Sequence, residues 1–450
     1  MKVVFLSTSE RNGGAAIAAG RLMQALLQSG VEVKMLVRDK QTSGDSIVSI
    51  NTSRLRRLIN FLRFAHERWI IYVHNRFSRK GLFAVSIANV GADVSQHPLV
   101  KSADIIHLHW INQGFLSLES IRRLIATGKP TIWTMHDMWP FTGACHIVSP
   151  PSSVSKRDYE HCLAYMDKCG DCPLLLRPAS QDLSRRTWMK KRTSNFASQI
   201  HFVAVSSWLR AKAKESSLMH DATIDIIPNT IDTTLFHPSD KIAARKRLSF
   251  PLDKKIIAMG AAKLNDPLKG FNFLREALSR LDTPKPDDCL LVLFGGIKDA
   301  PAFLDDIPIP HKWLGIISSS QAAQVYAAAD VTVSTSLFET FGQTLIEAMA
   351  CGCPVVSFNN SGQTDIIDHK INGYLAKYKD VADLARGIRR TLYESDYAEL
   401  SKNAVRKVAD CYSQEAVAQQ YINLYKTITD RKKRENHVDI KQYDKQNQYT

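Results

Sequence analysis

Two successive alternations of strand-like and helix-like segments constrain the fold of this chain more than any other feature. The first alternation places strand-like apolar runs at residues 3–6, 31–37, 104–110, 131–137 and 201–207, with helical patterns between them. The second places such runs at residues 254–262, 289–296, 330–336 and 354–358. Strands that alternate with helices form parallel sheets covered by helices. The sequence therefore predicts an α/β protein with two Rossmann-like domains that face one another across a cleft.

The length of 450 residues also favours two domains, because it exceeds what one hydrophobic core usually supports. The segment 225–240 contains Pro228 and Pro238 with little helical periodicity, and we expect the domain boundary near residue 235. The predicted organisation is an N-terminal domain at 1–235 with a cysteine-containing insert at about 140–180, a C-terminal domain at 236–412, a terminal helix at 413–430 that returns to the N-terminal domain, and a disordered polar tail at 431–450.

The charge of the chain suggests an anionic partner. The formal net charge is +15, and residues 54–80 carry eight Arg and Lys residues against the single acid Glu67, interleaved with large apolar residues. A helix with this pattern is either a membrane-surface element or a solvated face packed on its own domain. The sequence has no run of 18 apolar residues, and its first residues resemble a strand, so we expect a cytoplasmic protein without a membrane span.

The most informative motif is the stretch FETFGQTLIEAMACGCPVV at residues 338–356. Glu339 follows a predicted strand, and the Thr340–Gln343 capping-box pattern predicts a helix that begins near Phe341, with Glu347 about two turns inside it. A helix N-terminus attracts an anion, and two carboxylates accept hydrogen bonds from hydroxyl groups. A nucleotide-sugar matches this combination. The alternative is an ordinary turn with two solvated glutamates.

Other candidate residues lie where predicted strands end, which is where ligands bind in open α/β sheets. The Gly13–Gly14 pair follows the first strand, and Lys263 and Lys269 follow the first strand of the second domain, where a lysine can neutralise a diphosphate. His136 ends the 131–137 strand, where it could hold a sugar or acceptor hydroxyl. A structural turn, solvated lysines and a core histidine are the respective alternatives. Neither GxGxxG nor GxxxxGK[ST] occurs, so the usual dinucleotide and P-loop signatures are missing.

Four cysteines cluster within the predicted insert. Cys169 and Cys172 form a CxxC motif, and Cys145 and Cys162 would complete four sulfur ligands for a structural zinc ion. Free thiols and two disulfides are the alternatives, and disulfides are disfavoured in the cytosol.

Taken together, these motifs resemble the retaining GT-B glycosyltransferases of family four, and the resemblance covers nearly all of the chain. It rests on the two glutamates of the 338–356 stretch, the segment PNTID at 228–232, the first glycine-containing loop, the HD pair at 136–137 and the terminal helix. The stretch HDMWPFTGACH, followed by CGDCP, resembles more narrowly the branch of colanic-acid-type exopolysaccharide transferases. One departure is that Gly260-Ala261-Ala262-Lys263 stands where the family commonly has an Arg, which Lys263 would have to replace.

The resemblance implies roles for the candidate residues. Glu347 would hold the ribose and Glu339 the sugar hydroxyls, and backbone N–H groups around Phe341 and Gly342 would stabilise the diphosphate together with Lys269. His136 and the Gly13–Gly14 loop would contact the transferred sugar and the acceptor. The implied activity is a metal-independent transfer with retention, from a nucleotide-sugar to a polyprenyl-linked or oligosaccharide acceptor in surface polysaccharide synthesis. No cofactor other than the possible structural zinc is implied, and no nucleic acid.

This interpretation also implies a place in the cell and leaves other functions open. The protein would be cytoplasmic and could contact the anionic inner face of the plasma membrane peripherally. An epimerase or hydrolase of nucleotide-sugars on the same fold is an alternative, and so is a non-catalytic subunit that binds nucleotide-sugars.

Overall fold

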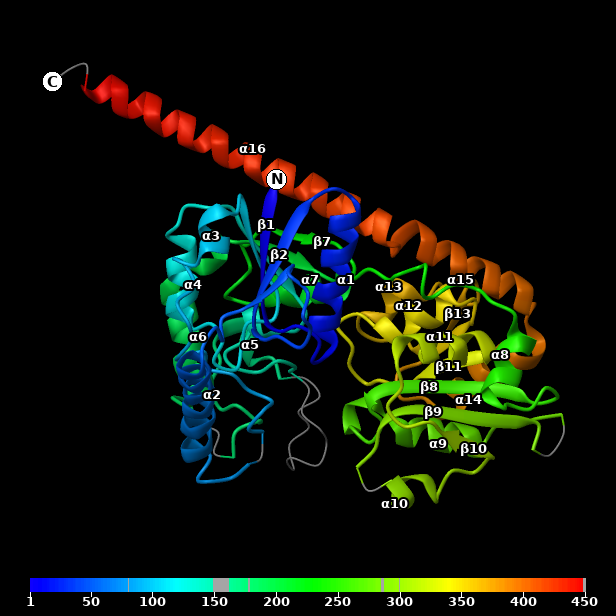
Figure 1. The fold of residues 1–450 in the computed structure, drawn as a ribbon. Coiled ribbons are helices and arrows are strands. Elements are labelled where there is room, and N and C mark those ends of the chain that lie inside the picture. Colours follow the sequence, from blue (N-terminus) through cyan, green and yellow to red (C-terminus); the bar gives the residue numbers. More distant parts are fainter. Residues whose placement is uncertain (80, 149–161, 177–178, 285–286, 299, 448–450) are drawn as a thin grey trace. The chain divides into compact units, whose positions relative to one another are not determined.

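The computed structural model describes the chain except for residues 80, 149–161, 177–178, 285–286, 299 and 448–450, and for residues 435–447 it describes the backbone only. The chain forms two compact units (Figure 1). Unit 1 comprises Met1–Val205, Arg210–Ile227 and Val417–Thr450, and unit 2 comprises Ser206–Leu209 and Pro228–Ala416.

Unit 1 is built on a parallel sheet of seven strands in the order β3-β2-β1-β4-β5-β6-β7. The central strands are rich in Val, Ile and Leu and are buried along most of their length, as expected for a sheet covered on both faces. The strands are β1 (Lys2–Ser9), β2 (Glu32–Asp39), β3 (Ile47–Ser49), β4 (Ile105–Leu108), β5 (Thr131–Met135), β6 (His201–Ala204) and β7 (Ile224–Ile226).

The helices that connect these strands also occupy the predicted alternation. They are α1 (Gly14–Gln28), α2 (Arg54–His74), α3 (Pro98–Ser102), α4 (Leu118–Ile125), α5 (Ala164–Asp167), α6 (Leu183–Ser194) and α7 (Ser207–Glu215), of which α7 begins in the Ser206–Leu209 segment of unit 2. Helix α16 (Gln414–Asn447) adds Val417, Ala418, Tyr421, Leu424 and Tyr425 to the same core as α1 and strands β1 and β2.

Unit 2 contains a six-stranded parallel sheet in the order β10-β9-β8-β11-β12-β13. Its strands are β8 (Lys255–Lys263), β9 (Cys289–Gly296), β10 (His311–Trp313), β11 (Val331–Ser334), β12 (Val355–Phe358) and β13 (Gly373–Ala376). Its helices are α8 (Lys241–Leu248), α9 (Phe271–Ser279), α10 (Ala300–Leu304), α11 (Ser319–Ala328), α12 (Gln343–Ala350), α13 (Gln363–Ile366), α14 (Val381–Arg389) and α15 (Tyr397–Cys411). One apolar core joins the sheet to α9 and α14.

Two boundaries differ from the prediction. The division between the units falls between Ile227 and Pro228, earlier than residue 235, because Ile231 bridges to Ser413 and Thr230 donates a hydrogen bond to Tyr412 O within unit 2. Helix α16 runs to Asn447, beyond residue 430 where the terminal helix was predicted to end, and the disorder predicted for residues 431–450 stays a prediction. Lys, Arg, Glu and Gln are good helix formers, and a helix that packing has already nucleated extends at little cost.

Candidate active site

The strand order of unit 2 brings two of the predicted site residues to one point. β8 and β11 are neighbours in the sheet, although β9 and β10 separate them in sequence and lie on the other side of β8. This reversal of direction is a topological switch point, where the loops after the two strands diverge and leave room for a ligand. Lys269 lies in the loop after β8, and Glu339 lies in the loop after β11.

Lys269 and Glu339 form an ion pair across this switch point. The distance between Lys269 Nζ and Glu339 Oε1 is 2.5 Å, and the two side chains are 27% and 23% exposed. Burial by itself would lower the pKa of Lys269, but the neighbouring Glu339 carboxylate outweighs it, so that the pKa is raised above its ordinary value. A protonated lysine and a carboxylate therefore stand together at the surface of the site, each partly open to a ligand.

A glycine holds the Lys269 loop against the end of β11. Gly270 has a φ of 61°, and a Cβ at this position would lie 2.2 Å from Thr335 O, so no other residue fits without a shift of the backbone. Thr335 Oγ1 in turn donates a hydrogen bond of 2.9 Å to Lys269 O. These contacts fix the ammonium group relative to the loop that carries Glu339.

The start of helix α12 differs from the predicted capping box. The helix begins at Gln343, its N-cap is Gly342 with a φ of 122°, and no side chain caps it. The Thr340–Gln343 pattern does not operate as a capping box, because the strained glycine turn and not Thr340 occupies the N-cap position. The helix therefore begins with backbone N–H groups that no side chain caps, the arrangement that favours a bound anion.

Phe341 and Glu347, on either side of the start of α12, make different contacts. Phe341 is 2% exposed and packs edge-on against Tyr412, so only its backbone can face a ligand. Glu347 lies just over one turn inside the helix, closer to its start than predicted, and accepts a hydrogen bond of 3.2 Å from Tyr326 Oη. A tyrosine that holds one carboxylate oxygen fixes the orientation of the group.

Lys263 stands apart from the ion pair. It is the last residue of β8, beyond a register irregularity between Gly260 and Lys263, and it is exposed. The loop that carries Lys269 begins directly after Lys263. Its role as the replacement for the family's usual Arg stays a prediction.

A glycine turn joins the first strand of unit 1 to helix α1. Gly13 is the N-cap of the long helix α1 and has a φ of 90°, a conformation that favours glycine. Both Gly13 and Gly14 are exposed, and a Cβ on either would meet nothing within 4 Å. The backbone conformation, and not lack of space, is thus what this turn requires of Gly13.

The HD pair at the end of β5 is held by a hydrogen-bonded corner. Asp137 accepts hydrogen bonds from Trp110 Nε1 (2.7 Å), His146 Nδ1 (2.6 Å) and the Trp139 backbone N–H (2.9 Å). Burial would raise the pKa of Asp137, but His146 and these hydrogen bonds lower it overall, so the carboxylate is ionised. The Asp137 carboxylate therefore fixes the turn that follows His136 through these three hydrogen bonds.

Three histidines lie next to one another: His107 in β4, His109 just after β4 and His136 just after β5. His136 Nε2 and His109 Nδ1 share a hydrogen bond of 3.0 Å, and burial lowers the pKa of His136 to about 4. His107 is fully buried and bonds to Tyr425 Oη (2.8 Å) and Thr134 Oγ1 (2.7 Å). His136 is neutral at pH 7, the form that suits a hydrogen bond to a sugar hydroxyl.

Sequence reasoning missed the position of Lys191. Lys191 belongs to a run of basic residues in α6 around Trp188, yet Trp188 and Lys191 are each only 1% exposed. Lys191 Nζ donates hydrogen bonds to Trp139 O and Thr142 O, and burial lowers its pKa to about 7. The Lys191 side chain therefore holds the turn that follows the HD pair. The run of basic residues in the sequence did not indicate that Lys191 is buried.

The four insert cysteines are all described, and all are free thiols. The Gly143 N–H donates to Cys169 Sγ (3.1 Å), and burial raises the pKa of Cys169 to about 11 and that of Cys172 to about 12. Among the described residues, no group of three or more His, Cys, Asp or Glu is arranged to hold a metal ion. The predicted structural zinc site at Cys145, Cys162, Cys169 and Cys172 stays a prediction, and part of the insert, at 149–161 and 177–178, lies outside the described residues.

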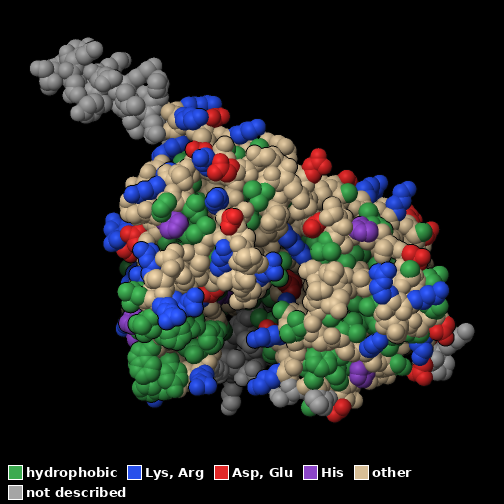
Figure 2. All heavy atoms as spheres, viewed as in Figure 1, with side chains coloured by type: hydrophobic (Ala, Val, Ile, Leu, Met, Phe, Trp, Pro, Cys, Tyr) green, Lys and Arg blue, Asp and Glu red, His purple; other side chains and the backbone are tan. Residues whose placement is uncertain are grey.

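Helix α2 turns its apolar side outward. Its buried positions include Asn60, Glu67 and Arg68, whereas a stripe of large apolar residues is exposed: Leu55, Leu58, Ile59, Phe61, Leu62, Trp69 and Val73. Glu67 accepts hydrogen bonds from the backbone N–H groups of Ile87 (2.8 Å) and Ala88 (2.9 Å), which offset the cost of burying its charge. Figure 2 shows these hydrophobic side chains gathered over α2. The two expectations for this segment, a membrane-surface element and a solvated face packed on its own domain, both stay predictions.

Comparison with known proteins identifies the fold. The structure is similar to sucrose-phosphate synthase from Thermosynechococcus elongatus, with a TM-score of 0.64 and 19% identity over 95% of this chain and 98% of the other. It is also similar to the Anabaena protein HepE, solved with UDP-glucose, with a TM-score of 0.59 and 16% identity over 95% and 100% of the two chains. The class is thus that of the GT-B glycosyltransferases, with two Rossmann-like domains.

Sequence comparison gives the family. A model described as Glycosyltransferase Family 4 matches residues 12–235, and one described as Glycosyl transferases group 1 matches residues 240–408. The chain belongs to glycosyltransferase family 4.

Two relatives match different shares of the chain. An uncharacterised glycosyltransferase of Methanocaldococcus jannaschii is 24% identical over 76% of this chain and 89% of its own length. The D-inositol 3-phosphate glycosyltransferase of Stackebrandtia nassauensis is 31% identical over 38% of this chain and 41% of its own length. No helix in the described part of the chain is both long and apolar enough to cross a membrane.

Proposed function

We propose that this glycosyltransferase binds a nucleotide-sugar at the β8–β11 switch point of unit 2 and transfers the sugar with retention of configuration. The observation that carries the proposal is the Lys269–Glu339 ion pair of 2.5 Å beside the uncapped start of α12. The pair offers a cation for a diphosphate and a carboxylate for sugar hydroxyls, and the helix start adds N–H donors. A structural neighbour solved with UDP-glucose supports a donor of this class.

Each residue has a separate role in the proposed transfer. Glu347, oriented by Tyr326, accepts hydrogen bonds from the ribose, and Glu339 accepts them from the donor sugar. When the bond between the sugar C1 and the diphosphate oxygen breaks, Lys269 and the N–H groups of Phe341 and Gly342 meet the charge that develops on the diphosphate. The acceptor hydroxyl forms the new bond to C1 from the side that the diphosphate leaves, and its proton passes to the departing diphosphate.

This electrostatic arrangement is also the basis for proposing that the transfer needs no metal ion. A lysine and a helix start can supply the positive potential that a divalent cation supplies in other transferases. Retention of transfer activity in excess chelator, and an unchanged anomeric configuration in the product by NMR spectroscopy, are the expected results. If the chelator abolished transfer activity and a divalent cation restored it, the proposal that the transfer needs no metal ion would be contradicted.

For the acceptor, we propose a polyprenyl-linked or oligosaccharide molecule at the anionic inner face of the plasma membrane, as used in surface polysaccharide synthesis. The support is the exposed apolar stripe of α2 together with the exposed basic residues at its two ends: Arg54, Arg56, Arg57, Arg76 and Arg79. An amphipathic helix of this kind lies in the membrane interface, where basic side chains reach anionic headgroups. His136 and the Gly13–Gly14 loop of unit 1 are the proposed contacts to the transferred sugar and the acceptor.

The experiment is a transfer assay with a panel of nucleotide-sugars and lipid-linked acceptors, run on the full chain and on Glu347→Ala. The matched control is Glu276→Ala, which removes an exposed glutamate from helix α9 of the same unit. We expect Glu347→Ala to lose most transfer activity and Glu276→Ala to keep it. Equal activity of wild type and Glu347→Ala would overturn the proposal, and turnover of the donor without acceptor to a new nucleotide-sugar would favour an epimerase.

A further inference from the structure

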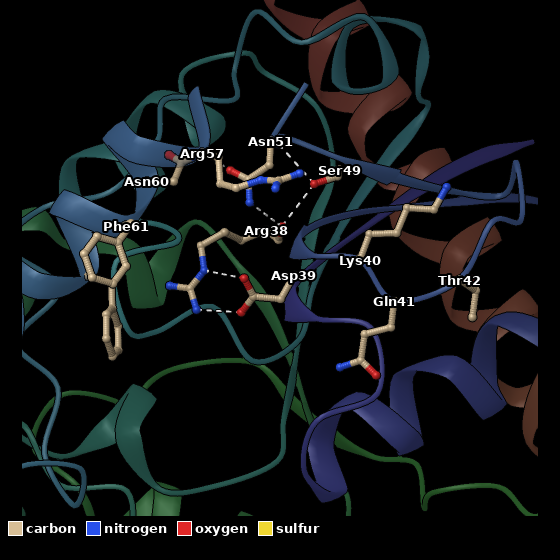
Figure 3. A pocket seen from close by; sticks show the side chains of 11 residues that line it. Arg38, Asp39, Lys40, Gln41, Thr42, Ser49, Asn51, Arg57, Asn60 and Phe61 are labelled. Carbon is tan, nitrogen blue, oxygen red and sulfur yellow. Dashed lines mark hydrogen bonds and ion pairs between the residues drawn. The ribbon is translucent and has the colours of Figure 1, made fainter. Parts of the chain in front are cut away.

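A cavity of about 700 Å³ lies in unit 1 between the carboxyl end of β2, strand β3 and the first half of α2 (Figure 3). This volume is within the range of roughly 300–1,000 Å³ that small-ligand sites occupy. The cavity adjoins the loop of the first strand, because the Glu10 carboxylate accepts hydrogen bonds from the backbone N–H groups of Gln41 (2.6 Å) and Thr42 (3.0 Å), two of its lining residues. It therefore stands at the carboxyl edge of the sheet, next to the proposed acceptor loop.

The wall of the cavity is fixed by a chain of hydrogen bonds. Arg63 donates to Asn60 Oδ1 (2.8 Å), Asn60 donates to Asn51 Oδ1 (2.7 Å), and Asn51 donates to Arg38 O (2.9 Å). The Arg38 guanidinium is held by both oxygens of Asp39 (2.9 and 2.6 Å) and also donates to Gln113 O. Side chains that are locked in this way keep their positions without a ligand, as a preorganised site requires.

The charge of the cavity favours an anion. Its lining contains Arg38, Lys40 and Arg57 against the single acid Asp39. Asp39 is already paired with Arg38, and Lys40 Nζ donates to Gly44 O (2.8 Å). The Arg57 side chain, in contrast, makes no hydrogen bond or ion pair with any residue that the structure describes. An arginine with its full set of donors open is suited to bidentate binding of a phosphate.

The rim of the cavity is apolar. Phe61, which is 60% exposed, and Phe64 line it on the α2 side, and the exposed stripe of α2 continues from them through Leu58 and Leu62. A bound molecule with a charged end in the cavity would therefore place an attached hydrocarbon chain against this stripe. A free phosphate or a free nucleotide would leave the stripe uncovered.

We propose that this cavity binds the phosphate or diphosphate headgroup of a lipid-linked acceptor, with Arg57 as the principal phosphate ligand and the lipid chain along the exposed face of α2. The inference rests on the proposed glycosyl transfer and names where its acceptor is held. The headgroup would lie beside the loop of the first strand, so that the sugar attached to it reaches the carboxyl edge of the sheet.

The test is co-sedimentation of the full chain with phosphatidylcholine vesicles that contain polyprenyl phosphate, without any nucleotide-sugar. Arg57→Gln is compared with Arg210→Gln, which removes the same charge from an exposed position of α7 outside the cavity lining. We expect Arg57→Gln to weaken binding about tenfold and Arg210→Gln to change it little, because of these two residues only Arg57 lines the cavity. Equal weakening of vesicle binding by both variants would overturn the proposed site, because general attraction of the basic protein to a charged membrane surface would then explain the binding.

Two further arms identify the source of the phosphate. Vesicles in which phosphatidylglycerol supplies the same charge should bind both variants equally. Inorganic pyrophosphate in solution should compete with polyprenyl phosphate only weakly, and competition as strong as that of the lipid would contradict a lipid-linked ligand. Donor binding at unit 2, measured by calorimetry, should be the same in wild type and Arg57→Gln, so a failure of the headgroup site is distinguishable from a failure of the proposed transfer.

Discussion

Lys269 Nζ lies 2.5 Å from Glu339 Oε1, and the two residues come from loops that are 70 positions apart in the sequence. They meet because β8 and β11 are neighbours in the sheet of unit 2 and end at the same edge. The ion pair keeps a cation and a carboxylate oriented before any ligand binds, which lowers the cost of organising the site during the reaction.

Replacement of Lys269 should affect the chemical step more than the fold. We expect Lys269→Gln to lower kcat about 100-fold or more, because it removes a cation that meets the leaving diphosphate. Lys402→Gln, which changes an exposed lysine on α15, is the control and should keep the wild-type rate. Initial rates at saturating donor measure the effect, and a wild-type kcat for Lys269→Gln would contradict the role.

Tyr326 should tune the donor affinity through Glu347. Its hydroxyl donates a hydrogen bond of 3.2 Å to Glu347 Oε2, so Tyr326→Phe removes one orienting contact and keeps the ring in the core. We expect a loss of donor affinity of about 3- to 10-fold, from the ~1 kcal/mol that such a hydrogen bond contributes. Calorimetric titration with the donor measures it. A change in kcat without a change in donor affinity would speak against this assignment.

Gly270 should be intolerant of a side chain for two separate reasons. It combines a φ of 61° with a Cβ position 2.2 Å from Thr335 O, whereas Gly315 has a φ of 71° with nothing within 4 Å of its Cβ position. Gly315→Ala therefore tests the backbone strain alone, at a cost of about 1 kcal/mol. We expect Gly270→Ala to lower the Tm further and to reduce transfer, since the Lys269 loop must move. Equal Tm values for the two variants would refute the close-contact argument.

The buried histidines predict how stability depends on pH. Burial lowers the pKa of His136 to about 4, below the ordinary value of 6.5, so the unfolded chain binds more protons between these two values. The stabilising contribution of neutral His136 is therefore complete above pH 6.5 and is lost as the pH falls toward 4. When the Tm is measured across this range and plotted against pH, the slope of the plot should be shallower for His136→Asn than for wild type. Identical slopes would mean that His136 does not titrate in this window.

Much of the architecture could be predicted from sequence because the strands are apolar runs bounded by turn residues. The sequence placed Lys269 and Glu339 after strands of the same domain, and their ion pair forms because these parallel strands end at a common edge, but the pairing itself was not predicted. The short strands β3, β7, β10 and β13 went unrecognised, because three or four residues carry too little pattern to distinguish a strand from a loop.

The failures have a common cause in tertiary contacts that spacing does not record. Lys191 looks like an exposed member of a basic run, but two backbone carbonyls and the Trp139 ring, 3.4 Å from its Nζ, hold it inside. Buried Glu67 is likewise accommodated by the N–H groups of residues 87 and 88, which allows α2 to turn its apolar stripe outward. In both places the partner lies far away in the sequence and belongs to a loop.

The central claim is that the β8–β11 edge of unit 2 is a nucleotide-sugar site, and its most direct measurement is calorimetric titration of the full chain with a panel of nucleotide-sugars. We predict that at least one of them binds wild type and that Glu347→Ala weakens this binding by tenfold or more, on the scale of about 1.4 kcal/mol per factor of ten. Glu276→Ala should bind as wild type does. Binding of the same nucleotide-sugar with unchanged affinity to Glu347→Ala, or binding of none to wild type, would contradict the claim.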